Sequence, residues 1–472
     1  MSKKITIYPV TRIEGHAKVT VIIDGGEVQD ARFQVLEFRA FEHFLKGRPV
    51  EEAPIIVTRI CGLCSVSHHL ASVKAVDKIF DLEIPPQAEK LRIILHLAGL
   101  IHSHVLHFFL LYLPDLALTS LPPNKRGFTE LVKHYPDLIK LVINIRGFAR
   151  RILETLGGSS IHPSAAIPGG FAKPLSSEDR IKLLDKCKEA TKLFSKVLSL
   201  IDNFIDKSLS QDVGIKSNFV SMYHQNDLAL YDSPKIRAIS SNGDLIDEFS
   251  ASEYLDHINE YVVPWSYAKA PFLIKLGYPN GLYRVGPLAR LNIVNKIDSD
   301  WAEELREKYG LKSSKPRNST RYYNVARLVE LAYCFDKICR LLEDKELEKT
   351  LRREKKIKVE HNDGVGVVEA PRGTLIHHYF VNDEGLVVKA NMIVATVQNT
   401  PIISEDIKSI VTKFIKANSL DEGKLISEIS TLIRDYDPCL SCSVHSLSIP
   451  LVIEFISTDG SLIARIPNES NK

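Results

Sequence analysis

Two segments decide how this 472-residue chain folds: RICGLCSVSH at residues 59–68 and DPCLSCSVH at residues 437–445. Each segment contains a Cys-x-x-Cys pair followed by a histidine. The four thiols can meet only if the fold brings the two ends of the chain together. Four convergent thiolates form a site for a soft metal ion, such as zinc, copper(I), iron or nickel. The sequence therefore predicts a metal site built from both ends of the chain.

The composition is that of a globular protein with a large core, with 44% hydrophobic and 25% charged residues. The formal net charge is +3 and there is no dense lysine and arginine stripe, which argues against a nucleic acid partner. Seven cysteines, four of them in tight pairs, indicate metal-binding thiols in a reducing compartment rather than a disulfide scaffold. The N-terminus lacks the apolar core of a signal peptide. We therefore expect a cytoplasmic protein.

One uncharged stretch, residues 93–113, is long enough to cross a membrane. It carries four histidines, which are costly in a helix that lies alone in lipid. These histidines are His96, His102, His104 and His107. We predict a buried helix of a large bundle rather than a membrane span, with the histidines in packing or local hydrogen bonds.

The rest of the pattern predicts a mainly helical chain with small β pieces, an α+β fold. Residues 4–38 alternate apolar and polar positions around a Gly-Gly turn, which is typical of a β-hairpin. Helices are expected at residues 62–80, 87–112, 127–156 and 320–345, and after the capping box of Ser176 and Asp179. Pro114 is expected to end the second of these helices. Short strands are expected within residues 211–295 and 364–396. We expect one compact unit around a central bundle of long helices.

The cysteine pairs by themselves leave several readings open. A structural zinc site with four cysteine ligands would be closed and redox-silent, and a thioredoxin-type pair is another possibility. Zinc ribbons and fingers usually gather their ligands within a few tens of residues, so the wide separation here argues only weakly against zinc.

The residues around the cysteines resemble the large, catalytic subunit of nickel-iron hydrogenases. The resemblance covers essentially the whole chain, and its motifs occur in the family's order. Besides the two cysteine segments they are RIEGH at residues 12–16, FE at 41–42, KGR at 46–48, HP at 162–163, PGG at 168–170, GPLAR at 286–290, EAPRG at 369–373 and ATVQN at 395–399. The resemblance implies the hydrogenase large-subunit fold and the reversible cleavage of H2 into protons and electrons.

The resemblance also implies a ligand set. Cys61 and Cys439 would be terminal ligands of nickel, and Cys64 and Cys442 would bridge nickel to an iron that carries carbon monoxide and two cyanides. The proton released from H2 would go to the Cys439 sulfur, and Glu14 would relay it outward. By itself, Glu14 would read as a solvated strand charge.

The resemblance implies that Arg372 lies over the open side of the metals, with Asp115 and Asp437 paired to it and Pro371 shaping the same surface. We call this group of residues the canopy. Two of these residues have simpler readings. Asp437 could be an N-cap, and Asp115 could belong only to the helix stop at Pro114.

The resemblance implies further contacts around the centre. The Thr396 hydroxyl would donate to a cyanide, and His68 would hydrogen-bond a bridging sulfur. Glu42, the Met392 carbonyl and His445 match a family site for magnesium, which a second iron could replace because imidazole is unusual for magnesium. The simpler reading of Glu42 is a surface charge on a helix.

Three cysteines remain, Cys187, Cys334 and Cys339, and all lie in helical patterns. We expect them to be buried packing residues, since three cannot complete an iron-sulfur cluster that needs four. The sequence offers no further electron carrier, so the electrons from H2 need a partner subunit that carries one. The resemblance implies an iron-sulfur small subunit, in an assembly with flavin-containing or heterodisulfide-reductase-type subunits.

The resemblance divides the chain into a domain at residues 1–445 and a C-terminal propeptide at residues 446–472. A nickel-dependent endopeptidase would remove the propeptide after His445. The alternative is that the tail is a final strand of the fold.

The sequence is most similar to the soluble multisubunit groups, either the viologen-reducing type linked to heterodisulfide reduction or the bidirectional nicotinamide-linked type. A hydrogen sensor is the first alternative, although sensors of this family typically lack the cleaved tail. A related respiratory-complex subunit would have lost the cysteine pairs, and a structural zinc protein would have no use for Glu14 or Arg372.

Overall fold

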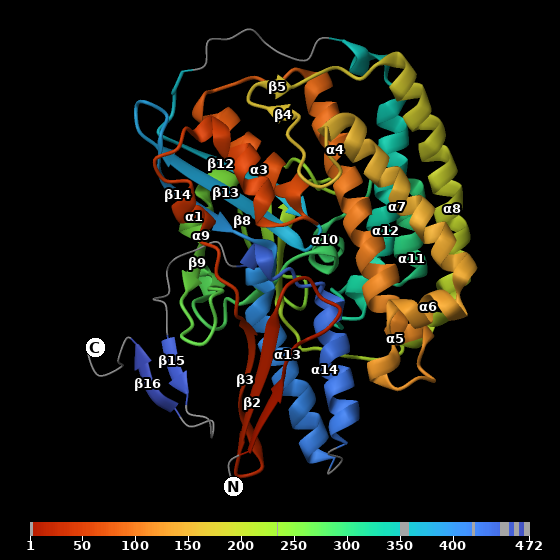
Figure 1. Ribbon diagram of the computed structural model, residues 1–472, viewed down its shortest axis with the longest axis vertical. Helices are drawn as coiled ribbons and strands as arrows, with labels where there is room; N and C mark the ends of the chain where they lie inside the picture. The colour runs from red at the N-terminus through yellow and green to blue at the C-terminus, as the bar shows by residue number, and fades with distance from the viewer. Residues whose placement is uncertain are drawn as a thin grey trace.

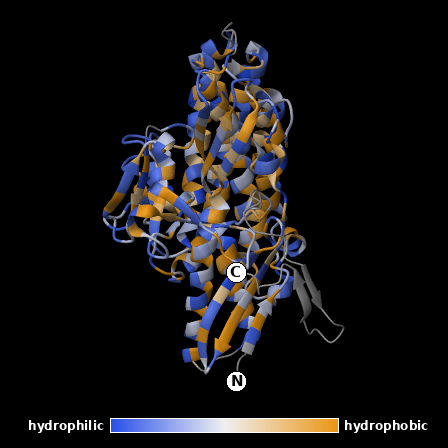
Figure 2. Ribbon diagram, turned by 90° about the vertical axis from the view of Figure 1, so that its left-hand side faces the viewer, coloured by the Kyte–Doolittle hydropathy of each residue, from blue (hydrophilic) through white to orange (hydrophobic). Residues whose placement is uncertain are grey.

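The computed structural model describes residues 3–233, 235–349, 358–417 and 421–443, together with the backbone of 453–456 and 462–466. A bundle of long helices stands beside a small antiparallel sheet, and an N-terminal sheet packs on the C-terminal helix α13 (Ala395–Lys416; Figure 1). The prediction of a mainly helical α+β fold is confirmed. The helices mix hydrophobic and hydrophilic positions along their length, as amphipathic helices around a shared core do (Figure 2).

The helices are α1 (Phe41–Phe44), α2 (Ala53–Ile56), α3 (Ser65–Ile79), α4 (Pro86–Val105), α5 (Leu113–Ala117), α6 (Phe128–His134), α7 (Pro136–Gly157), α8 (Ser177–Leu209), α9 (Tyr254–His257), α10 (Pro287–Ile293), α11 (Asp300–Lys308), α12 (Tyr322–Leu342), α13 (Ala395–Lys416) and α14 (Glu422–Tyr436). The strands are β1 (Lys3–Ile7), β2 (Ala17–Asp24), β3 (Glu27–Val35), β4 (Ala166–Ile167), β5 (Gly170–Phe171), β6 (Asn218–Tyr223), β7 (Lys235–Ile239), β8 (Leu245–Phe249), β9 (Ile258–Tyr261), β10 (Ala270–Leu273), β11 (Tyr283–Arg284), β12 (Asp363–Ala370), β13 (Gly373–Val381), β14 (Val387–Ile393), β15 (Ile453–Ile456) and β16 (Leu462–Ile466).

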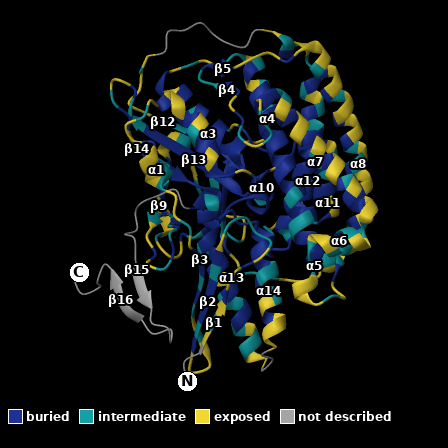
Figure 3. Cartoon of the chain, viewed as in Figure 1, coloured by how far each residue is buried: buried dark blue, intermediate teal, exposed yellow. Residues whose placement is uncertain are grey.

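The central bundle consists of α4, α7, α8 and α12. Helix α4 is buried on almost every side, whereas α8 keeps one exposed face along the edge of the molecule (Figure 3). The predicted cap of α8 is present, because the Ser176 Oγ accepts a hydrogen bond from the Asp179 N–H.

The apolar helix continues beyond the position where we expected it to end. A π-helical segment, Leu106–Tyr112, follows α4 and leads directly into α5. Pro114 lies in the first turn of α5, where a missing N–H costs little, so the prediction that it ends the helix is wrong. The stretch Pro86–Ala117 is long and apolar enough to cross a membrane by length and composition, but 78% of its most apolar window is buried in the protein. The prediction of a buried bundle helix is confirmed.

The N-terminal hairpin is confirmed and carries one more strand. Strands β2 and β3 pair across the Gly25–Gly26 turn, and β1 pairs with the other edge of β2. The buried face of this sheet lies on α13, and the Ser404 hydroxyl of that helix accepts a hydrogen bond from the Phe33 N–H. The N-terminal segment is thereby fixed beside the C-terminal helices.

Strands β12, β13 and β14 form an antiparallel sheet that packs against α3. Two glycines of β12 allow this close approach. A Cβ atom at Gly364 or Gly366 would lie 2.3 or 2.0 Å from the carbonyl oxygen of Ala75 or Ala71, respectively. This packing sets the position of α3, which follows directly after the first cysteine pair.

The remaining cysteines differ from the prediction. Cys187 of α8 and Cys339 of α12 form a disulfide with 5.9 Å between their Cα atoms, so the expectation that all three are packing residues is wrong for this pair. The two positions are 152 residues apart, and only the packing of the two helices brings them together. Cys334 is a free buried thiol, as predicted.

The tail predicted to be a propeptide lies largely outside the described residues. Within it, β15 and β16 pair with each other in a two-stranded antiparallel sheet. The boundary after His445 stays a prediction, since His445 is itself outside the described residues.

Candidate metal centre

The four cysteines of the two pairs converge, as the sequence predicts. Their sulfur atoms all lie within 4.8 Å of one another, and all four residues are buried. The Cys64 Sγ is 2.9 Å from the Cys442 Sγ, and the Cys61 Sγ is 3.3 Å from the Cys439 Sγ. The two ends of the chain therefore meet at one compact set of sulfur ligands.

This donor set fits nickel and iron. Thiolates are soft ligands, and a buried cluster of four of them excludes the hard cations. Burial raises the pKa of the Cys439 and Cys442 thiols well above the usual value. Metal binding therefore has to displace protons from these thiols, which couples loading of the centre to proton release.

Backbone conformations at the ends of two helices aim the cysteines at the centre. Cys64 is the N-cap residue of α3. Asp437 ends α14 in the left-handed region, with φ 54°, and turns the chain toward Cys439. The reading of Asp437 as an N-cap is therefore wrong, because it is a C-cap.

The segment 12–16 lies directly against the second cysteine pair. Glu14 and Cys439 form a parallel bridge, in which the Leu440 N–H donates to the Glu14 carbonyl at 3.1 Å. Gly15 makes this approach possible, because it has φ +78° and a Cβ atom there would lie 2.8 Å from the Leu440 Cβ.

The Glu14 carboxylate contacts a cysteine ligand. Its Oε2 atom is 3.1 Å from the Cys439 Sγ and 3.0 Å from the Ser441 backbone N–H. Its Oε1 atom accepts a hydrogen bond from the Ser441 hydroxyl at 2.5 Å. Glu14 is neither fully buried nor fully exposed, so the carboxylate connects the sulfur to the outer part of the protein.

Arg372 is buried and its guanidinium is held at three atoms. The Nε donates to the Asp437 carbonyl, the Nη2 to the Asp437 Oδ1 and the Nη1 to the Ser103 Oγ, each at 3.0 Å. The predicted pairing with Asp437 is present. Burial raises the pKa of the Asp437 carboxyl although Arg372 favours its charged form. Sequence reasoning missed Ser103, whose only signal is a small polar residue among the buried histidines of α4.

Asp115 does not pair with Arg372, so that prediction is wrong. The carboxylate is buried, and its Oδ1 accepts from the Arg12 Nη2 at 2.5 Å while its Oδ2 accepts from the Arg434 Nε at 2.6 Å. Helix α5 follows the π-helical segment and faces the N-terminal segment and α14 instead of the turn that carries Arg372.

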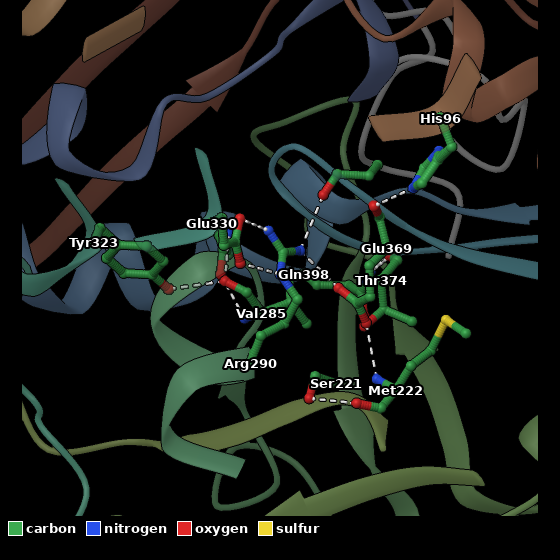
Figure 4. Close-up of polar contacts among 12 residues, drawn as sticks. His96, Ser221, Met222, Val285, Arg290, Tyr323, Glu330, Glu369, Thr374 and Gln398 are labelled. Carbon is green, nitrogen blue, oxygen red and sulfur yellow. Dashed lines mark hydrogen bonds and ion pairs between the residues drawn. The ribbon is translucent and has the colours of Figure 1, made fainter. Parts of the chain in front are cut away.

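The turn between β12 and β13 carries Pro371 and Arg372, and a buried ion-pair cluster supports it (Figure 4). Arg290 makes a bidentate pair with Glu330 at 2.6 and 2.7 Å. The Arg290 Nη1 also donates to the Glu369 Oε2 at 2.7 Å and to the Ala370 carbonyl at 3.0 Å. The guanidinium therefore bonds the last two residues of β12, immediately before the turn.

The same cluster holds the strand that follows the turn. The Glu369 Oε1 accepts from the Thr374 hydroxyl at 2.7 Å and from the Met222 N–H at 2.8 Å. The Gln398 Nε2 donates to the Thr374 carbonyl at 2.7 Å. Burial would raise the pKa of Glu330, but Arg290 and the hydrogen bond from His104 bring it down to about 2. Residues from the three motifs at 286–290, 369–373 and 395–399 thus hold the turn that carries Arg372 in place.

A substitution in this cluster tests how strongly it holds the turn. Glu369→Gln places an amide donor against Arg290 and leaves one side of that buried guanidinium without an anionic partner. We expect the free energy of unfolding to fall by about 2 kcal/mol, measured by urea unfolding of the assembled enzyme. An unchanged unfolding midpoint would contradict the support role of the cluster.

The residues of the expected magnesium site are only partly described. The Met392 N–H donates to the Glu42 Oε1 at 2.7 Å. Glu42 is buried, which overturns its reading as a surface charge. His445 lies outside the described residues, so the ion site stays a prediction.

Thr396 and His68 are also predicted to contact the metal ligands. Thr396 lies close to a cysteine in space, and His68 lies four positions after Cys64 in the sequence. The Thr396 Oγ1 accepts from the Cys439 N–H at 3.0 Å, which leaves its own hydroxyl proton available for donation. The His68 Nδ1 is 3.0 Å from the His377 Nε2 in a buried pair of imidazoles. The contacts predicted from these two residues to the metal ligands stay predictions.

Proteins of one known family match this chain along nearly its whole length. A family model described as nickel-dependent hydrogenase matches residues 39–117 and 221–445, and a model described as HoxL-like matches residues 4–38. One relative is a subunit of the F420-non-reducing hydrogenase of Methanothermobacter marburgensis, which is 38% identical over 98% of this chain and 100% of its own length. Another is the beta subunit of the NAD-reducing hydrogenase HoxS of Cupriavidus necator, which is 35% identical over 98% and 99% of the two chains.

Solved structures show the same similarity. The crystal structure of an NAD+-reducing [NiFe]-hydrogenase in the H2-reduced state superposes with a TM-score of 0.87 and 37% identity, over 94% of this chain and 99% of the other. The Ni-Fe-Se hydrogenase from D. vulgaris Hildenborough shares the fold, with a TM-score of 0.73 and 23% identity over 94% and 100% of the two chains.

Proposed function

The chain belongs to the nickel-dependent hydrogenase family, in which it is a catalytic large subunit, and from this premise we propose how its residues serve the reversible cleavage of H2. The observation that carries the proposal is the convergence of four buried cysteines from both ends of the chain, with the Glu14 carboxylate on the Cys439 sulfur. A closed structural zinc site would give this carboxylate no purpose.

The four cysteines would hold nickel, with Cys61 and Cys439 as terminal ligands. Cys64 and Cys442 would also bind an iron that carries carbon monoxide and two cyanides. When bound, these metals supply the redox chemistry and the site at which H2 is cleaved. The protein would contribute four buried sulfurs, which lose their protons when the metals bind, and the polar groups around them.

Glu14 would relay protons between the Cys439 sulfur and the outside. The 3.1 Å contact between its Oε2 and that sulfur is within hydrogen-bond reach. The other carboxylate oxygen bonds the Ser441 hydroxyl, so the carboxylate is held in place while it accepts or donates a proton.

Arg372 would form the canopy over the metals with Pro371, Asp437 and Thr396. Lysine keeps the charge but lacks the planar fork that bonds Asp437 and Ser103 together. We expect Arg372→Lys to lower H2-dependent dye reduction by about 100-fold while nickel and iron stay bound, measured by activity and metal analysis of the same sample.

A matched control is available in α4. Arg92 is an equally buried arginine that bonds Asp77 and two backbone carbonyls. Arg92→Lys should leave the turnover of the folded enzyme unchanged. Normal turnover in Arg372→Lys would contradict the canopy role.

The relatives are named as subunits of larger hydrogenases, so this chain works with partner subunits. We propose that the direct electron acceptor is an iron-sulfur small subunit, with flavin-containing or heterodisulfide-reductase-type subunits beyond it, in the cytoplasm. Glu42, the Met392 carbonyl and His445 would hold magnesium or a second iron. A nickel-dependent endopeptidase would remove residues 446–472.

The experiment that tests the proposed centre is metal analysis of the complex purified without oxygen. We expect one nickel per copy of this chain, with iron in excess of nickel because the partner subunits carry iron-sulfur clusters, together with H2-dependent reduction of a viologen dye. Zinc in place of nickel, with no turnover, would contradict the proposal.

A further inference from the structure

We propose that Asp115 is a positioning residue that holds Glu14 at the Cys439 sulfur, an inference that rests on the proposed relay role of Glu14. Asp115 forms two ion pairs, at 2.5 Å to Arg12 and at 2.6 Å to Arg434. We call these three residues the Asp115 clamp. The side chains of Asp115 and Arg434 are only 4% and 3% exposed, and that of Arg12 is 16% exposed.

The two arginines of the clamp also bond the backbone of the neighbouring segments. The Arg12 Nη1 donates to the Leu111 carbonyl at 2.7 Å, and the Arg434 Nη1 donates to the Thr11 carbonyl at 3.0 Å. Residues 11 and 12 are therefore fixed from both sides, two positions before Glu14. Arg12 has φ +60°, and a residue other than glycine keeps this conformation only where its surroundings impose it.

The π-helical segment sets the direction of Asp115. A π-helical turn inserts a residue into an α-helix and rotates the residues after it by about 100°. Leu111 belongs to this segment and Asp115 follows it within α5. The π-helical segment thus supplies a carbonyl, and α5 a carboxylate, to the same N-terminal stretch.

The clamp and the metal centre join the same two segments of the chain at two points. At one point, Asp115 links Arg12 to Arg434. At the other, the Leu440 N–H bonds the Glu14 carbonyl and the Cys439 sulfur contacts the Glu14 carboxylate. The first point sets the position of the segment that carries Glu14, and a hydrogen bond of 3.1 Å tolerates little displacement.

A double-mutant cycle in the assembled enzyme tests this role. Asp115→Asn keeps the size of the side chain but turns a donor toward one of the two arginines. We expect kcat to fall about tenfold, with an unchanged KM for H2 and unchanged nickel content. Asp115→Asn combined with Glu14→Gln should be no slower than Glu14→Gln alone, because the clamp acts through Glu14.

Two further variants distinguish an effect on the position of Glu14 from a general loss of stability. Arg12→Gln removes the more exposed arm of the clamp and should reproduce the loss of kcat. Asp77→Asn breaks a similarly buried arginine pair, with Arg92 near the start of α4, whereas Asp115 follows the far end of that helix. Its effect should multiply with that of Glu14→Gln, as expected for independent sites.

Hydrogen exchange provides a readout that does not depend on turnover. The backbone amides of residues 10–16 should exchange faster in Asp115→Asn and Arg12→Gln but not in Asp77→Asn. Unchanged exchange, or losses that multiply in the Asp115 and Glu14 double mutant, would overturn the proposal. If Glu14→Gln alone keeps full turnover, the relay itself is wrong, and the exchange measurement still decides whether Asp115 positions this segment.

Discussion

We expect Cys439→Ser to abolish H2 turnover and to leave the protein without nickel. The Cys439 sulfur lies at the middle of the set, 3.3 Å from the Cys61 sulfur and 2.9 Å from the Cys442 sulfur, and it is also the sulfur that Glu14 contacts. Serine offers a harder oxygen ligand whose proton is far more difficult to remove. The substitution removes a metal ligand and the proton acceptor at once, so we expect no measurable turnover in dye-reduction assays.

Cys334→Ser is the matched control for this experiment. Cys334 is equally buried, on α12 and outside the set of four, and burial likewise raises the pKa of its thiol. The folded Cys334→Ser enzyme should keep its nickel and its H2 turnover. Retention of nickel and activity by Cys439→Ser would contradict the assignment of the four cysteines as the metal site.

The second large effect is expected at Glu14. Glutamine keeps the size of the side chain and can still accept from the Ser441 N–H, but it cannot take up a proton from the Cys439 sulfur. A positioned general acid or base contributes about 10²- to 10⁴-fold. We therefore expect Glu14→Gln to lower H2 oxidation by at least about 100-fold while nickel and iron stay bound, measured by kinetics and metal analysis of one preparation.

Glu260→Gln is a suitable control, because Glu260 is also partly buried and pairs with Lys269 in another sheet. It should leave the turnover unchanged. A loss of nickel in proportion to the loss of activity in Glu14→Gln would assign Glu14 a structural role instead of a relay role.

The sequence predicts the metal centre well because its chemistry is concentrated in short motifs. Two Cys-x-x-Cys pairs can form one site only if the ends of the chain meet, and they do. The pairing of Arg372 with Asp437 and the place of Glu14 beside the Cys439 sulfur are predicted only through the resemblance of their motifs to the hydrogenase family, and the structure has both contacts.

The contacts that the sequence does not predict depend on how distant helices pack. Asp115 after Leu113–Pro114 reads equally well as a helix stop, and only the π-helical segment turns it toward Arg12 and Arg434. The disulfide between Cys187 and Cys339 depends in the same way on the packing of α8 against α12.

The support of the Arg372 turn could be recognised only in part. The motifs that contain Arg290 and Glu369 are visible in the sequence, but nothing in their spacing joins them to Glu330 in the middle of α12. A buried carboxylate at an apolar helix position is a weak signal, because its partner is known only once the fold is known.

The most direct test of the nickel-iron centre is an anaerobic infrared spectrum of this chain purified with its partner subunits. Carbon monoxide and cyanide bound to iron give sharp bands in a region where a protein has no absorption of its own. We expect these bands in a chain that ends at His445 and contains nickel. A chain that ends at His445, carries zinc and shows no such bands would contradict the nickel-iron centre.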